Sequence, residues 1–144
     1  MPKSKIFLPD VNVWLALASE RHVHSGVCGS WLNRIEAGST AFCRITQMGL
    51  LRLLTNSAVM QDEVLSSSEA WFVYRRMLTD ERISFQSEPP GLEDRWRKLT
   101  SRDKPAPKLW TDAYLAAFAE ASGLQIVTLD GAVLALAPEA LVLR

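Results

Sequence analysis

Three aspartates stand where this sequence could most readily build a reactive site. Asp10 follows a short apolar run, Asp130 follows another, and Asp112 opens an Ala-rich segment. Carboxylates that converge raise each other's pKa unless a divalent cation neutralises them. Oxygen ligands of this kind suit Mg²⁺ or Mn²⁺, and such an ion can activate water and stabilise charge on a phosphodiester. If the fold brings the three together, we expect metal-assisted phosphodiester hydrolysis.

Each aspartate taken alone also has a structural explanation. Asp112 can complement the positive end of its own helix dipole. Asp10 and Asp130 are of a residue type that turns favour. Whether they form a site depends on the elements that carry them.

The elements expected around the aspartates alternate between strands and helices. The predicted strands cover residues 5–8, 40–43, 83–85, 125–129 and 141–143. The predicted helices cover residues 11–18, 25–37, 44–55, 70–78, 92–102 and 112–122. Asn12 and Thr111 are the expected caps of the first and last of these helices.

This alternation predicts an α/β fold with three layers, α/β/α, around a mainly parallel sheet of about five strands. Ligands bind such a sheet in the crevice beyond the carboxyl ends of its strands. Asp10 and Asp130 end two of the predicted strands, and Asp112 opens the helix that leads to the second of them. The topology can therefore bring the three carboxylates to one edge.

The composition is that of one ordinary domain over residues 1–144. Sixteen Lys and Arg balance sixteen Asp and Glu, and 48% of the residues are hydrophobic. Cys28 and Cys43 lack the spacing of a zinc site, so we expect buried thiols in a reducing compartment, the cytoplasm. The longest apolar run, residues 113–119, is far short of the ~20 residues that a membrane span needs. The zero net charge disfavours a strongly basic nucleic-acid binder, although only as an average over the surface.

Four segments of the chain resemble PIN-domain ribonucleases, especially the VapC toxins of bacterial toxin–antitoxin pairs. They are LPDVNVWLAL at residues 8–17, RITQMGLLRLL at 44–54, WTDAYLAAFA at 110–119 and VTLD at 127–130. The match spans nearly the whole chain in the expected order, which is more specific than any one segment. The resemblance implies a PIN-like fold and an endoribonuclease that depends on Mg²⁺ or Mn²⁺.

The resemblance also assigns roles to individual residues and implies partners. It makes Asp10, Asp112 and Asp130 the metal-binding carboxylates, with Asn12 and Thr128 as polar neighbours that orient carboxylates or water. It implies an RNA substrate, a homodimer and a VapB-type antitoxin whose tail occupies the acidic groove. The resemblance does not specify which RNA is cleaved, where it is cleaved or how many metal ions bind.

Gln47 departs from the family pattern, because many members place a Glu in the matching ITE-type segment. A neutral amide here would leave the site with three formal negative charges, which predicts weaker binding of a second metal ion. It leaves open a catalytically impaired PIN relative that binds RNA or protein. A phosphotransfer or receiver-type domain is a weaker alternative, because Asn12 stands where a haloacid-dehalogenase-like phosphatase needs its second Asp, and no Lys follows Asp130 at a receiver-like site.

Basic residues near the aspartates are candidates for holding an RNA backbone, since Lys and Arg neutralise phosphates. The candidates are Arg97, Lys98, Arg102 and Lys108 upstream of Asp112, and Arg44 and Arg52 on either side of Gln47. For the first four the alternative is a solvated helix face. For Arg44 and Arg52 it is an internal ion pair.

Overall fold

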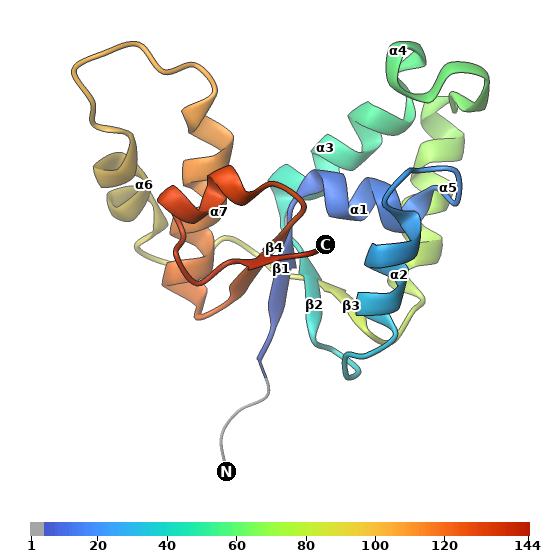
Figure 1. Cartoon of the computed structure of the whole chain (residues 1–144), viewed down its shortest axis with the longest axis horizontal. Coiled ribbons are helices and arrows are strands. Elements are labelled where there is room, and N and C mark those ends of the chain that lie inside the picture. Colours follow the sequence, from blue (N-terminus) through green and yellow to red (C-terminus); the bar gives the residue numbers. More distant parts are fainter. Residues whose placement is uncertain (1–4) are drawn as a thin grey trace.

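The computed structural model describes residues 5–144, which fold around one parallel sheet (Figure 1). Its strands are β1 (Phe7–Pro9), β2 (Thr40–Phe42), β3 (Ile83–Phe85), β4 (Gln125–Thr128) and β5 (Leu141–Val142). Their order across the sheet is β3-β2-β1-β4-β5, and every neighbouring pair is parallel. The five-stranded parallel sheet confirms the predicted α/β class. It also makes β1 and β4 neighbours in the middle of the sheet.

Helices cover both faces of the sheet and complete the three layers (Figure 1). One face carries α1 (Val11–Ala18), α2 (Ser25–Leu32), α3 (Arg44–Leu54) and α5 (Ser67–Leu78). The other carries α6 (Leu92–Thr100) and α7 (Leu109–Ser122). The remaining elements are the short helix α4 (Ser57–Met60) and two 3₁₀ helices, η1 (Gln61–Glu63) and η2 (Gly131–Ala135).

The hydrophobic core is divided in two by the sheet, because successive strand residues point to opposite faces. On the α1 side, Trp14 stacks on Phe42 with 3.6 Å between ring centroids, and both are fully buried. On the α7 side, Leu8 and Ile126 pack with Phe118. Burial of these aromatic and aliphatic side chains is the main favourable contribution to folding.

The helix ends differ from the prediction at several places, including α5, which begins at Ser67, and α6, which ends at Thr100. Asp10, and not Asn12, caps α1 through its side chain. The helix α7 begins at Leu109, so Thr111 lies within its first turn and is no cap. The helix α2 ends at Leu32, five residues before the predicted end, and the Leu32 carbonyl accepts hydrogen bonds from the Ile35 N–H (3.3 Å) and from Arg82 (3.1 Å). The pattern also missed α4, η1 and η2.

An ion pair between Asp80 and Arg82 holds the connection from α5 to β3. Arg82 donates to Asp80 Oδ1 from Nε (2.9 Å) and to Oδ2 from Nη2 (2.7 Å). Its Nη1 donates to the Leu32 carbonyl and to Asn33 Oδ1 (2.9 Å). The hydrogen bonds from Arg82 hold the pKa of Asp80 below its ordinary value. The pair therefore ties the start of β3 to the end of α2.

We expect Asp80→Asn to lower the free energy of unfolding by about 1 kcal/mol at pH 7. Because the folded-state pKa of Asp80 is lowered, this stabilisation is present above its unfolded pKa and is lost as the pH falls through the folded one. The difference between wild type and variant should therefore shrink below about pH 4. Urea unfolding at pH 7 and pH 3 measures it. Asp62→Asn, in an exposed ion pair with Arg21, is the control and should change little; an Asp80→Asn difference that is the same at both pH values would refute this.

Both cysteines are buried and free, as expected from their spacing. Burial, with a smaller contribution from the negative charge of Asp10, raises the pKa of the Cys28 thiol to about 11. Cys28 therefore stays a protonated, inert thiol at neutral pH.

Across residues 5–144, no helix has both the length and the hydrophobicity to cross a membrane.

Candidate active site

Asp10 lies at the centre of the candidate site, at the junction of β1 and α1. Its backbone N–H donates to the carbonyl of Val127 (2.9 Å), which continues the pairing of β1 with β4. Its Oδ1 accepts a hydrogen bond from the N–H of Val13 (3.1 Å), and its Oδ2 accepts one from the hydroxyl of Thr128 (2.6 Å). The carboxylate is thus held by the first turn of α1 and by the end of β4, the strand that pairs with β1.

Thr128 connects Asp10 with the segment that carries Asp130. The Thr128 side chain is fully buried at the end of β4, and its hydroxyl accepts a hydrogen bond from the Asp130 N–H (3.0 Å). Asp130 in turn caps η2, accepting from the N–H of Ala132 at 2.9 Å. The parallel register of β1 and β4 therefore brings together two aspartates that are 120 positions apart in the numbering.

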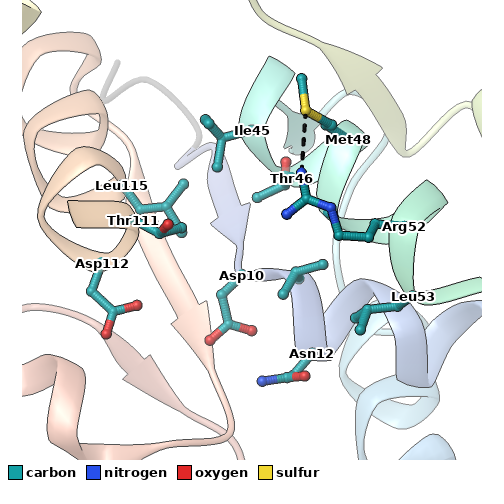
Figure 2. A pocket seen from close by; sticks show the side chains of 12 residues that line it. Asp10, Asn12, Ile45, Thr46, Met48, Arg52, Leu53, Thr111, Asp112 and Leu115 are labelled. Carbon is teal, nitrogen blue, oxygen red and sulfur yellow. Dashed lines mark hydrogen bonds between the residues drawn. The ribbon is translucent and has the colours of Figure 1, made fainter. Parts of the chain in front are cut away.

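Asp112 lies in the first turn of α7. It faces Asp10 across a cavity that both residues line (Figure 2). Burial raises the pKa of Asp112, and the neighbouring charge of Asp130 raises it further. Burial also raises the pKa of Asp10, against the hydrogen bonds from Thr128 and Val13, and the charge of Asp112 adds to the rise. The three carboxylates are thus electrostatically coupled, with Asp112 interacting with both others; we call them the aspartate row.

The donor chemistry of the aspartate row fits a hydrated divalent cation. Among residues 5–144, no three Asp, Glu, His or Cys side chains lie close enough to ligate one ion directly. Mg²⁺ in proteins is commonly bound through only one or two carboxylates and keeps several waters. An ion here would therefore be held by one or two aspartates of the row and by water, and its charge would relieve their mutual repulsion.

A cavity of about 340 Å³ lies beside Asp10, between α1, α3 and the start of α7 (Figure 2). One part of its lining is polar and consists of Asp10, Asn12, Arg52, Thr46, Thr111 and Asp112. The other part is apolar and consists of Val11, Ile45, Met48, Leu53 and Leu115. Of the predicted polar residues, Asn12 is exposed at this cavity, whereas Thr128 is buried behind Asp10.

Gln47 faces away from the cavity. It is 6% exposed, its Oε1 accepts a hydrogen bond from Arg44 Nη1 (2.5 Å), and it is also hydrogen-bonded to Tyr74 of α5. The helical repeat places Gln47 on the buried side of α3 with Leu50 and Leu54. Gln47 is therefore positioned to join α3 to α5, and it is not among the described residues that line the cavity.

We expect Gln47→Glu to leave the affinity for Mn²⁺ unchanged, because the new carboxylate would face Arg44 instead of the cavity. Asn12→Asp makes the same charge change at the cavity lining and should raise the affinity. Calorimetric titration of both variants and wild type makes the comparison. Tighter binding by Gln47→Glu than by wild type, to the extent seen for Asn12→Asp, would show that position 47 does contribute to the metal site.

Gly49 is a cavity residue that the sequence prediction missed. A Cβ atom built on it would lie 2.8 Å from Val11 Cγ2, closer than such atoms approach, so the absence of a side chain allows α3 to pack this closely against α1. Ile45, Met48, Gly49 and Arg52 follow the i, i+3, i+4, i+7 spacing of one helix face. That spacing could have identified, from the sequence alone, the face of α3 that lines the cavity.

Of the six predicted basic residues, Arg52 is the one in the cavity lining within the described chain. Its Nη2 contacts Met48 Sδ at 3.8 Å (Figure 2). Arg44 lies with its guanidinium over the ring of Phe85, 4.8 Å from the centroid, and donates to Gln47. Arg44 therefore makes internal contacts with a neutral amide and an aromatic ring, and among residues 5–144 it does not form the internal ion pair that was the predicted alternative.

The other four basic residues lie on the α6 side, in or after that helix. Arg97 pairs with Glu93 on the exposed face of α6 (3.1 Å), as expected for a solvated helix face. Lys98 is also exposed on α6, while Arg102 and Lys108 are exposed in the connection that leads to α7 and Asp112.

Known proteins resemble this chain in sequence and in fold. The PIN domain family model matches residues 7–137. The ribonuclease VapC41 of Mycobacterium tuberculosis is 48% identical over 132 residues, covering 88% of this chain and 90% of that protein. The M. tuberculosis structure of VapC20, a Sarcin-Ricin loop cleaving toxin, has a TM-score of 0.67 at 15% identity, covering 96% of this chain and 99% of that chain.

A second solved structure, of VapBC2 from Rickettsia felis bound to a DNA fragment from their promoter, has a TM-score of 0.65 at 11% identity. It covers 95% of this chain and 96% of that chain. At these identities the two structures establish the fold alone. The match to the family model and the 48% identity to VapC41 establish family membership. This chain therefore belongs to the PIN domain family, in its group of VapC ribonucleases.

Proposed function

We propose that this protein is an endoribonuclease dependent on Mg²⁺ or Mn²⁺, acting as the toxin of a VapBC-type toxin–antitoxin pair. The observation that carries the proposal is the aspartate row, Asp10, Asp112 and Asp130, at the carboxyl edge of the sheet in a chain of the PIN family. The 48% identity to a protein named as a ribonuclease supports the same reaction.

Asp10 and Asp112 would hold the ion from opposite sides of the opening, and Asp130 would act on its water shell. The ion, when bound, supplies positive charge to the phosphodiester and lowers the pKa of a water molecule. Thr128 fixes the orientation of the Asp10 carboxylate through its 2.6 Å hydrogen bond. The exposed amide of Asn12 is placed to orient water or a phosphate oxygen.

Arg52 is the basic residue best placed to bind a phosphate of the RNA, because it lines the same cavity as Asp10 and Asp112. Arg97, Lys98, Arg102 and Lys108 would contact phosphates further along the strand on the α6 side. These contacts position RNA without reading its sequence. The neutral net charge is compatible with this, since the aspartate row accounts for three of the sixteen acidic residues.

The partners we propose are a VapB-type antitoxin and a second copy of this chain, within a single-domain protein of the cytoplasm. Solved structures with the same fold include VapBC2 from Rickettsia felis and VapBC from Salmonella typhimurium, both bound to DNA. An antitoxin arginine placed among the three carboxylates would block the site, because it supplies positive charge without activating water.

The catalytically impaired alternative rested on Gln47, and that residue is buried against α5, away from the cavity. The experiment that separates the two functions is incubation of the purified protein with a pool of structured RNA in Mn²⁺, in Mg²⁺ and in EDTA. Cleavage with either metal and none in EDTA supports the nuclease. Binding of RNA without cleavage under all three conditions would support the impaired relative instead.

A further inference from the structure

We propose that the cavity beside the aspartate row is a pocket for one unpaired nucleotide of the RNA, with the base lying against the apolar side of α3. The proposal rests on the proposed function and deepens it, because it identifies the part of the substrate that the protein would read.

The size of the cavity limits its occupant. At about 340 Å³ it lies near the lower end of the roughly 300–1,000 Å³ that small-molecule sites occupy, which suits a single nucleoside. A base pair within a helix could not enter, since its bases are stacked and paired. Proteins that read RNA sequence mostly take bases that are splayed out of loops and bulges.

The lining of the cavity has two chemically different sides, as a nucleotide does. Asp10, Asn12 and Asp112 supply the polar groups at which we propose that the phosphate and metal ion bind. Met48 and Leu53 of α3 add apolar surface to the same lining, and Met48 is 47% exposed. A phosphate or a hydrated ion alone would leave this apolar surface in water, whereas a flat base would cover it.

Arg52 adds a planar cation to the cavity lining beside Met48. None of the ion pairs within residues 5–144 involves Arg52, and its contact with Met48 Sδ is a weak one. The described lining contains no aromatic ring, so a base here would stack on the guanidinium plane and on aliphatic groups. Arg52 would thus serve the base as well as the adjacent phosphate.

Gly49 keeps this pocket open, because the room between α1 and α3 has no space for a Cβ atom. Gly49→Ala would push the Val11 side chain toward the cavity that both residues line. Val11→Ala in the same chain removes the methyl group at 2.8 Å and leaves the Cβ of Val11 at 3.4 Å. We therefore expect Gly49→Ala to close the pocket and the additional Val11→Ala substitution to reopen it.

The test is a titration of the metal-free protein with the four ribonucleosides and with D-ribose, followed by methyl NMR signals of the cavity. Nucleosides are uncharged, so the aspartate row does not repel them. We expect at least one nucleoside to bind about fivefold or more tightly than ribose and to shift the methyl signals of Met48 and Leu53. Gly49→Ala should abolish this preference, and Gly49→Ala with Val11→Ala should restore it.

This readout does not depend on cleavage, so it separates the pocket from the nuclease. Equal binding of ribose and all nucleosides by wild type would overturn the proposal while leaving the nuclease standing. Cavity shifts caused by an arginine-containing peptide, with none caused by nucleosides, would assign the cavity to a protein partner and also overturn it. If Gly49→Ala does not fold, the wild-type comparison of nucleosides with ribose still decides.

Discussion

Asp112→Asn is expected to slow RNA cleavage at least about 100-fold, with little change in stability. Loss of an outer residue that merely supports a metal ligand typically costs 10- to 100-fold, so loss of a proposed ligand should reach at least the upper end of that range. The side chain is exposed in the first turn of α7 and faces the cavity. Asparagine preserves its shape and removes its charge.

The stability of Asp112→Asn should stay near that of wild type because two effects oppose each other. The variant loses a favourable charge at the helix N-terminus, worth about 0.3–1 kcal/mol. It also removes a carboxylate whose pKa is raised by burial and by the charge of Asp130, so the ionised form is disfavoured in the folded state. We therefore expect thermal midpoints that agree within about 3 °C.

The control for Asp112→Asn is Asp94→Asn, which makes the same change in the first turn of α6, at an exposed position. It should cleave RNA at the wild-type rate. The measurement is the initial rate on one fluorescent RNA with saturating Mn²⁺ and again with tenfold less. Cleavage by Asp112→Asn within a few-fold of wild type at both concentrations would remove Asp112 from the proposed site.

Thr128→Val should lower the cleavage rate by about 10- to 100-fold, although Thr128 touches no substrate. Its buried hydroxyl donates to Asp10 Oδ2 and accepts from the Asp130 N–H, so it positions both ends of the aspartate row at once. Valine has the same shape without these bonds and leaves the part-buried N–H of Asp130 without this partner. We expect a loss of about 1–3 kcal/mol in the free energy of unfolding.

Two variants isolate the role of the Thr128 hydroxyl. Thr128→Ser keeps the hydroxyl and should retain most of the activity. Thr40→Val makes the same substitution in fully buried β2, where the Thr40 hydroxyl has no hydrogen-bond partner among the described residues, and should be neutral or stabilising.

A positioning role for Thr128 also predicts a change in metal dependence that a general loss of stability would not cause. With Asp10 less firmly held, half-maximal cleavage by Thr128→Val should need several-fold more Mn²⁺ than wild type, and excess Mn²⁺ should restore part of the rate. An unchanged Mn²⁺ midpoint, with the loss confined to the maximal rate, would contradict this role.

The sheet and its edge were predictable because they follow from strong local patterns. Short apolar runs stopped by Pro9–Asp10 and by Asp130–Gly131 mark two strand ends, and parallel pairing leaves those ends on one edge. The hydrogen bond from Thr128 to Asp10 was not predictable. It requires the β1–β4 register, which depends on packing between residues far apart in the chain.

At position 47 the motif and the helix phase draw attention to different properties. Resemblance drew attention to the residue type at position 47, whereas the spacing from Leu50 and Leu54 places that position on the buried face. Ile45 and Met48 belonged to an apolar stripe and would be assigned to the core by pattern alone. In the structure they line the cavity, since a hydrophobic residue at helical spacing can face a pocket as well as a core.

The sheet order has a consequence for when the protein becomes active during synthesis. The strand β4 lies between β1 and β5, and Thr128 meets Asp10 across 118 positions of the chain. A growing polypeptide therefore leaves the ribosome with its first strand complete but with no neighbouring strand on the side where the proposed metal site will form. The proposed active site would therefore stay incomplete until β4 has been synthesised and has paired with β1.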